Sequence, residues 1–458
     1  RENVYKLIRM KHNFLYAVAL LAMASPLSSM AQESKVWTLN DCIRYALEQN
    51  IQLQQNRLSL EESKVDVKTA KAALFPSLSF STGHNVMNRP YQETSSMVSG
   101  TEIISSSSKT SYTGNYGLDA QWTVWNGGRR LKTIKQQQLA QETAELTVAE
   151  QENNLQEQIT QLYVQILYAT ESVQINEGTL ELSKAQYERG KELLAAGEIS
   201  KSELAQLESQ VSNDNYQLVT AQSTLADYKL QLKQLLELDG EQEFTLAIPE
   251  LDETKVLSPI PNKADIYNAA LALRPEIQSG KLNIQSADLS VRMAKAGYLP
   301  TLNLSAGIGT NHTTGNDFSF SEQVKRGWNN SIGLTLSLPI FSNRETKSAV
   351  EKAKLQYESS KLDLTNDQKE LYREIESMWL DASNAQQQFV AADATLKSSQ
   401  SSYELVNEQF KLGMVNTVEL LTEKNNLMSA QQQRVQAKYM AILNRVLLEF
   451  YAGNQIEL

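Results

Sequence analysis

The residue types that bind metals or act as nucleophiles are few in this sequence and lie far apart. A single cysteine, Cys42, occurs among 458 residues, so the chain can form neither an internal disulfide nor a cysteine-based metal site. The three histidines, His12, His84 and His312, are separated by long stretches of chain. We therefore expect no metal site from them.

Motifs of catalytic and nucleotide-binding sites are also missing from the sequence. The patterns GxSxG, GxGxxG and the P-loop do not occur, and the glycines of GIGTNHTTG at 307–315 have the wrong spacing for a phosphate-binding loop. Adjacent acids such as Glu61 and Glu62 follow each other on a predicted helix, so their side chains do not face each other. The sequence predicts neither an enzyme nor a bound cofactor.

The composition favours long helices and argues against a nucleic-acid partner. Gln is abundant, whereas 19 Gly and 9 Pro are few for a chain of this length. The formal net charge is −10, so the basic excess typical of nucleic-acid-binding proteins is missing.

The N-terminus has the pattern of an export signal. A basic start at 10–12 precedes the apolar run FLYAVALLAMA at 14–24, and small residues follow at 29–31. We predict that 1–31 is an N-terminal extension and signal peptide, the alternative being a short buried helix. No later apolar run approaches the ~20 residues of a membrane helix.

The rest of the chain contains one pattern twice. Three pairs of segments match in the same order: AKAALFPSLSFS (70–81) with AKAGYLPTLNLS (294–305), YGLDAQWTVW (116–125) with IGLTLSLPIF (332–341), and YERGKELLAAGEISKSEL (187–204) with YELVNEQFKLGMVNTVEL (403–420). Each copy predicts a helix (about 40–74 and 264–298), two strands and a long helical hairpin. We predict repeats at 36–239 and 263–452, joined by a linker at 240–262 into one elongated domain.

Apolar residues recur every seven positions along the long helical segments. The series are Leu155, Leu162 and Ala169 in the first copy, and Leu371, Met378 and Ala385 in the second. This spacing predicts helices that supercoil around their neighbours. A filamentous coiled coil would explain the helices, but it would not explain the strands between them.

The segments between the helices alternate apolar and polar residues. Within 112–125, one face carries Tyr112, Gly114, Tyr116, Leu118, Ala120, Trp122 and Val124, and the other carries Thr113, Asn115, Gly117, Asp119, Gln121, Thr123 and Trp125. The same alternation follows Pro76 and Pro300 and runs through 328–340. It is typical of membrane β-barrel strands, although a half-buried soluble sheet shows it too.

Four such strands cannot close a barrel around a lumen, so several chains would have to share one. Pro76 and Pro300 would mark the helix-to-barrel junction, because proline ends a helix.

This layout resembles the outer membrane efflux protein family, the TolC-like exit ducts. The resemblance rests on TLNDCIRYALEQN (38–50), the two proline-containing segments, SLPIF (337–341), and the glycine turns AAGEIS and KLGMVN. It implies a mainly α fold with a β-barrel portion: a long coiled-coil α-helical barrel plus four transmembrane β-strands per chain, completed as a homotrimer.

The resemblance also implies a function. The protein would be the passive exit duct of a tripartite efflux or type I secretion system, in the cell outer membrane with a long periplasmic extension. Its partners would be outer membrane lipid, a periplasmic adaptor (membrane fusion) protein and an inner-membrane pump of RND or ABC type. An exported coiled-coil scaffold without a pore is the alternative, and drug efflux and protein secretion remain equally compatible with the sequence.

The family has a ring of acidic side chains at its periplasmic gate. Glu203 and Glu419, six residues after the tip glycines Gly197 and Gly413, are the candidates by position. Acids in the first turn of a helix also serve as caps, so this alternative stays open. Gly197 and Gly413 would end their helices in a left-handed conformation and shape the tips that contact the adaptor.

Overall fold

The computed structural model describes residues 36–91, 95–99, 102–106, 109–239, 244–249, 256–315 and 317–458. The predicted signal peptide at 1–31 lies outside these residues, as does part of the predicted linker at 240–262.

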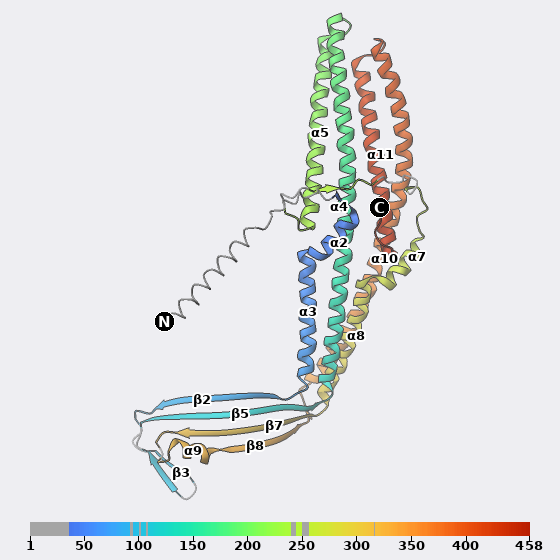
Figure 1. The fold of residues 1–458 in the computed structure, drawn as a ribbon. Coiled ribbons are helices and arrows are strands. Elements are labelled where there is room, and N and C mark those ends of the chain that lie inside the picture. Colours follow the sequence, from blue (N-terminus) through green and yellow to red (C-terminus); the bar gives the residue numbers. More distant parts are fainter. Residues whose placement is uncertain are drawn as a thin grey trace, which may run out of the picture.

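The described part of the chain forms long helices and one principal sheet (Figure 1). The helices are α2 (Leu39–Gln49), α3 (Ile51–Ala72), α4 (Arg129–Ala196), α5 (Lys201–Leu235), α7 (Lys263–Leu273), α8 (Pro275–Lys295), α9 (Phe320–Gly327), α10 (Glu345–Lys411) and α11 (Thr417–Tyr451), with a short 3-10 turn η1 (Ala296–Tyr298). The strands are β1 (Val36–Trp37), β2 (Ser77–Asn88), β3 (Ser95–Ser99), β4 (Glu102–Ser106), β5 (Thr110–Asn126), β6 (Thr245–Leu246), β7 (Thr301–Thr313) and β8 (Asn329–Ser337).

The helices α4 and α10 run through the whole helical part of the molecule. They contain 68 and 67 residues, which corresponds to about 100 Å each. Near the sheet they pack against α3 and α8, and toward the opposite end they form hairpins with α5 and α11 (Figure 1). The predicted long hairpins are thus confirmed. None of the helices in the described ranges combines the length and apolar character that a membrane crossing requires.

The main hydrophobic core lies at the middle of the helical part, where β1, α2 and β6 meet the long helices α4, α10 and α11. Trp37 of β1, Cys42 of α2 and Phe244, directly before β6, belong to this core together with Tyr163 of α4 and Leu443 of α11. The strands β1 and β6 pair in parallel, which joins the segment before α2 to the segment after α5. Buried heptad positions such as Leu155 and Ala385 belong to this core, as the seven-residue pattern predicts.

The prediction of one continuous helix at 40–74 and another at 264–298 is wrong in one respect, because each of these segments forms two helices. The first breaks between α2 and α3 at Asn50, whose ψ of 124° is not helical and whose side chain accepts a hydrogen bond from Leu53 N. The second breaks at Arg274, because proline at position 275 disfavours a helical residue before it. Buried Arg274 pairs with Glu157 at 3.0 Å and stacks on the Tyr451 ring at 3.7 Å.

The four predicted strands form one antiparallel sheet in the order β2-β5-β7-β8. Partner residues share a face, so the apolar positions line up in rows such as Phe80, Leu118 and Ile308. The opposite face carries rows such as Ser79, Asp119, Gly307 and Ser331. The alternation in the sequence therefore describes two real faces of one sheet.

Trp125 is a correction to this pattern. Strict alternation places it on the polar face, but the β5–β7 register shifts between Thr123 and Trp125, and Trp125 lies opposite apolar Leu302. A bulge at Val124 adds one residue to β5 and thereby turns Trp125 to the apolar face.

Candidate functional site

The ends of the two hairpins form the candidate site, at the end of the molecule remote from the sheet (Figure 1). The helix α4 ends at Gly197 with φ +78°, and α10 is followed by Gly413 with φ +68°. Both predicted tip glycines therefore take the left-handed conformation that ends a helix. A β-carbon at either glycine would meet no atom within 4 Å, so backbone conformation, rather than crowding, favours glycine there.

A cleft of about 400 Å³ lies between the two tips, and both predicted gate residues line it. Its wall combines the acids Glu198, Glu203 and Glu419 with apolar residues, among them Met414 and Val415. The structure thus brings together two acids that lie 216 positions apart in the sequence.

The two acids are engaged differently. Glu203 belongs to a capping box: its carboxylate accepts a hydrogen bond from Ser200 N at 2.7 Å, and Glu203 N donates to Ser200 Oγ. The bond from Ser200 N lowers the pKa of Glu203. Glu419 N donates to Asn416 Oδ1 at 2.9 Å, but the hydrogen bonds of the described residues include none to the Glu419 carboxylate.

An apolar cluster joins the hairpins just inside the tips. It contains Leu193 of α4, Tyr403 and Phe410 of α10, and Leu420 of α11. The tip itself leaves Leu412 and Met414 exposed, by 74% and 69%. The hairpin ends therefore present apolar side chains beside an acidic cleft.

Further from the tips, a buried ion pair connects the hairpins. The Lys424 ammonium of α11 donates to Asp214 of α5 and to Ser183 of α4, and Lys424 and Asp214 are only 1% and 3% exposed. Burial lowers the pKa of Lys424, whereas the bond to Asp214 opposes that shift. Sequence reasoning missed this pair, although Asp214 stands seven residues after buried Leu207, where an apolar residue is expected.

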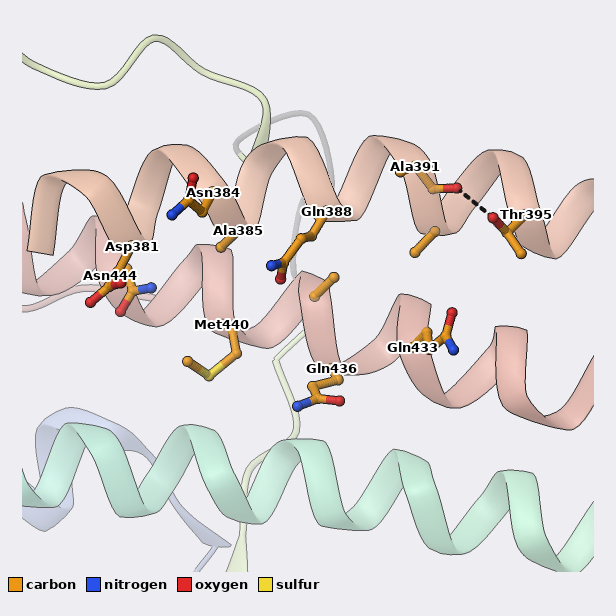
Figure 2. Close-up of a pocket in the computed structure, with 12 residues that line it drawn as sticks. Asp381, Asn384, Ala385, Gln388, Ala391, Thr395, Gln433, Gln436, Met440 and Asn444 are labelled. Atoms are coloured by element: carbon orange, nitrogen blue, oxygen red, sulfur yellow. Dashed lines mark hydrogen bonds between the residues drawn. The ribbon is translucent and has the colours of Figure 1, made fainter.

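A second hollow lies between α10 and α11 at mid-length (Figure 2). It has a volume of about 630 Å³ and is lined by alanines and by amide side chains such as Asn384, Gln388 and Gln436. Within the described ranges, no group of three His, Cys, Asp or Glu residues could hold a metal ion.

The junction between helices and sheet also contains predicted residues. Pro76 directly precedes β2, and Pro300 directly precedes β7. Sequence reasoning missed the neighbouring turn at Gly127, whose φ is +67° and where a β-carbon would lie 3.0 Å from Ala296 O.

A sequence profile described as outer membrane efflux protein matches residues 42–237 and 266–454. The chain belongs to the outer membrane efflux protein family. As a member of this family it is an outer membrane channel protein with a periplasmic helical extension, and it belongs with channels rather than with enzymes. The predicted family and location are confirmed.

Individual relatives agree with this membership. The outer membrane efflux protein BepC of Brucella suis is 21% identical over 94% of this chain and 88% of its own length. The alkaline protease secretion protein AprF of Pseudomonas aeruginosa is 23% identical, and the match spans 65% of this chain and 62% of AprF. The crystal structure of the outer membrane protein VceC from Vibrio cholerae superposes with a TM-score of 0.74 at 15% identity, over 92% of this chain and 97% of that one.

Proposed function

We propose that this chain is one subunit of a homotrimeric exit duct that conducts substrate passively out of the periplasm. The observation that carries the proposal is an open sheet at one end of a bundle about 100 Å long. In the described part of the chain, β2 and β8 each pair on one side only, over 12 and 9 residues. Such edges require partners inside a membrane, because unpaired backbone groups are costly in lipid.

The exposed side chains of the sheet support the same proposal. On one face Ile332 is 79% exposed, Leu78 is 69% exposed and Leu334 is 66% exposed. An apolar face of this extent suits lipid, while the opposite face of Ser, Thr, Asn and Asp suits water. Three copies would supply twelve strands to a common barrel, with the polar face toward the lumen.

The helices would continue this barrel as a tunnel through the periplasm. The amide-lined hollow between α10 and α11 gives each copy a surface that another copy can cover, with hydrogen bonds available to both sides (Figure 2). The same order of helix, strand, strand and hairpin in both halves supports an internal duplication at 36–239 and 263–452, joined by 240–262.

Each candidate residue has a role in this proposal. Glu419 of three copies would form the acidic ring at the periplasmic gate, and Glu203 would chiefly cap α5, since its carboxylate is already bonded to Ser200 N. Gly197 and Gly413 would shape the tips where a periplasmic adaptor docks.

Pro76 and Pro300 would set the junction with the barrel. An inner-membrane pump, of RND or ABC type, would supply the energy. The name of BepC refers to efflux and that of AprF to protease secretion, so both kinds of cargo fit.

Topology in intact cells tests the proposal. Cysteine replaces Ser321 on α9, beside the outer end of the sheet, or Ala196 at the tip, both of which are exposed. We expect a membrane-impermeant thiol reagent to label position 321 in intact cells, and position 196 only after the outer membrane is breached. The unsubstituted protein is the control, because its native Cys42 is buried. Equal labelling of both positions in intact cells would instead support the scaffold.

A further inference from the structure

The two histidines of the described residues meet in one row of the sheet. The β2–β5 register places His84 opposite Gly114, and the β5–β7 register places Gly114 opposite His312. The two histidines thus flank one glycine on the central strand, although 228 positions separate them in the sequence.

The imidazole nitrogens converge on the space above that glycine. A β-carbon at position 114 would lie 2.7 Å from His312 Nδ1 and 3.2 Å from His84 Nδ1. The Tyr112 hydroxyl lies 2.6 Å from His84 Nδ1. Imidazole nitrogens from β2 and β7 therefore lie beside one position that only glycine leaves open, and a hydroxyl group from β5 adjoins the nitrogen of His84.

The two Nδ1 atoms are engaged differently: that of His84 contacts the Tyr112 hydroxyl, and that of His312 has no hydrogen-bond partner among the described residues. In the His84 tautomer that carries its proton on Nε2, Nδ1 accepts from the Tyr112 hydroxyl, and Nε2 lies 3.1 Å from Thr82 Oγ1. A bond of this kind on the far nitrogen is what orients a metal-binding histidine. His312 Nδ1 is, in addition, buried.

We propose that His84 Nδ1, His312 Nδ1 and Tyr112 Oη form a binding site for a divalent transition metal ion such as Cu²⁺, Zn²⁺ or Ni²⁺. Neutral imidazole is a ligand that these ions favour. On binding, the Tyr112 hydroxyl would give up its hydrogen bond to His84 Nδ1 and release its proton to solvent, which frees the Nδ1 lone pair and leaves a phenolate oxygen for the ion. The bound ion would tie β2, β5 and β7 together at the end of the sheet remote from the helices. The rings stack on Tyr112 and Tyr116, which keeps them above the sheet.

The location suits an ion that arrives from water. The histidines lie on the same face as Phe80, Leu118 and Ile308 but two rows closer to the loops, and the row between them contains Thr82, Tyr116 and Thr310. The His84 side chain is exposed. All three ligands belong to one chain, so the site does not depend on the homotrimer, and its failure would leave the exit duct untouched.

Copper binding by the full-length protein in detergent tests this site, with a purification tag that contains no histidine. Equilibrium dialysis against micromolar CuCl₂ counts the bound ions, and electron paramagnetic resonance reports nitrogen ligands. We expect one Cu²⁺ per chain with coupling to two nitrogens. His84→Gln and His312→Gln should each lower the affinity at least about tenfold, the lower end of the effect known even for residues that only orient ligands.

Two further variants distinguish a metal-binding site from a cluster of stacked aromatic rings that binds no ion. Gly114→Ala keeps both histidines but fills the space between their nitrogens, so it should also abolish binding. Tyr116→Phe keeps the ring that stacks on His312 and should leave binding unchanged. Equal copper binding by the wild type and the His84→Gln/His312→Gln double variant, or no binding by the wild type at micromolar copper, would overturn the proposal.

Discussion

At the scale of single residues, Glu203 and Glu419 occupy the same position in their helices but differ in the hydrogen bonding of their carboxylates. Each is the third residue of its helix, and each backbone N–H is bonded to the capping side chain. Only the Glu203 carboxylate also accepts a hydrogen bond from the backbone, namely from Ser200 N. Its lowered pKa means that this stabilisation is present above its ordinary value of 4.5 and is lost as pH falls through the lower folded value.

The two acids should therefore respond differently to neutralisation. We expect Glu419→Gln to reduce the cation preference of the channel, measured as a smaller reversal potential across a planar bilayer under a KCl gradient, without loss of stability. Glu203→Gln should leave the reversal potential nearly unchanged but weaken the start of α5, seen as faster amide exchange there at neutral pH. The reverse result would move the gate to Glu203.

The buried pair of Lys424 and Asp214 leads to a second prediction at this scale. Asp214→Ala leaves the ammonium buried without its partner, so it should destabilise the protein by about 3–5 kcal/mol. The double variant Asp214→Leu/Lys424→Met removes both charges and should recover most of that loss. Urea unfolding followed by helical circular dichroism measures both. A double variant as unstable as Asp214→Ala would show that the pair does not act as a unit.

At the scale of elements, the glycine turns differ in what surrounds them. Gly197 has φ +78° with open space around it, whereas Gly127 has φ +67° and a β-carbon there would lie 3.0–3.1 Å from atoms of Ala296 and Leu299. The first glycine is required by backbone conformation alone. The second is required by conformation and by the close approach of the segment that leads from α8 into β7.

Alanine substitutions separate these two requirements. We expect Gly197→Ala to cost about 1–2 kcal/mol, the cost of a left-handed conformation for a residue with a β-carbon. Gly127→Ala should cost more, because its new methyl group also meets Ala296 O. Thermal unfolding of both variants gives the comparison. Equal losses would mean that the junction shifts to accommodate the methyl group.

At the scale of the whole molecule, the sheet has one apolar and one polar face, but its edge strands β2 and β8 pair on one side only within the described part of the chain. Its edge strands bury little against their own chain: all of β2 is exposed, and so is most of β8. The helical part, in contrast, has a continuous core at mid-length. The sheet must therefore gain its stability from surroundings that the single chain does not provide.

Two neighbouring residues of β8 test which surroundings these are. Leu334 lies on the apolar face opposite Leu304, and Thr335 lies on the polar face opposite Asn303. Leu334→Arg should cost about 2–4 kcal/mol near the middle of the lipid-facing band and deplete the protein from the outer membrane fraction. Thr335→Arg should be tolerated and alter conductance. Equal tolerance of both would argue against a lipid-facing sheet.

The sequence by itself determined the elements and the sheet faces. Seven-residue and two-residue periods are local, so the long helices and the four strands could be predicted from them. The helix-ending glycines Gly197 and Gly413 could be predicted too, because glycine adopts the left-handed conformation that ends a helix. The break at Asn50 combines a local cap, from Leu53 N to its side chain, with a distant contact that the sequence does not reveal, since Asn50 Nδ2 donates to Leu235 O. The bulge that turns Trp125 likewise follows from the pairing of β5 with β7. These features arise from the fit between segments.

Only the tertiary structure decided which distant residues meet. It placed Glu203 and Glu419 in one cleft, buried Lys424 against Asp214, and brought His84 and His312 to the same glycine. Strand register and helix packing set these distances, and both depend on many weak contacts summed over the whole chain. The histidines, far apart in sequence, are therefore neighbours for a reason that no local pattern contains.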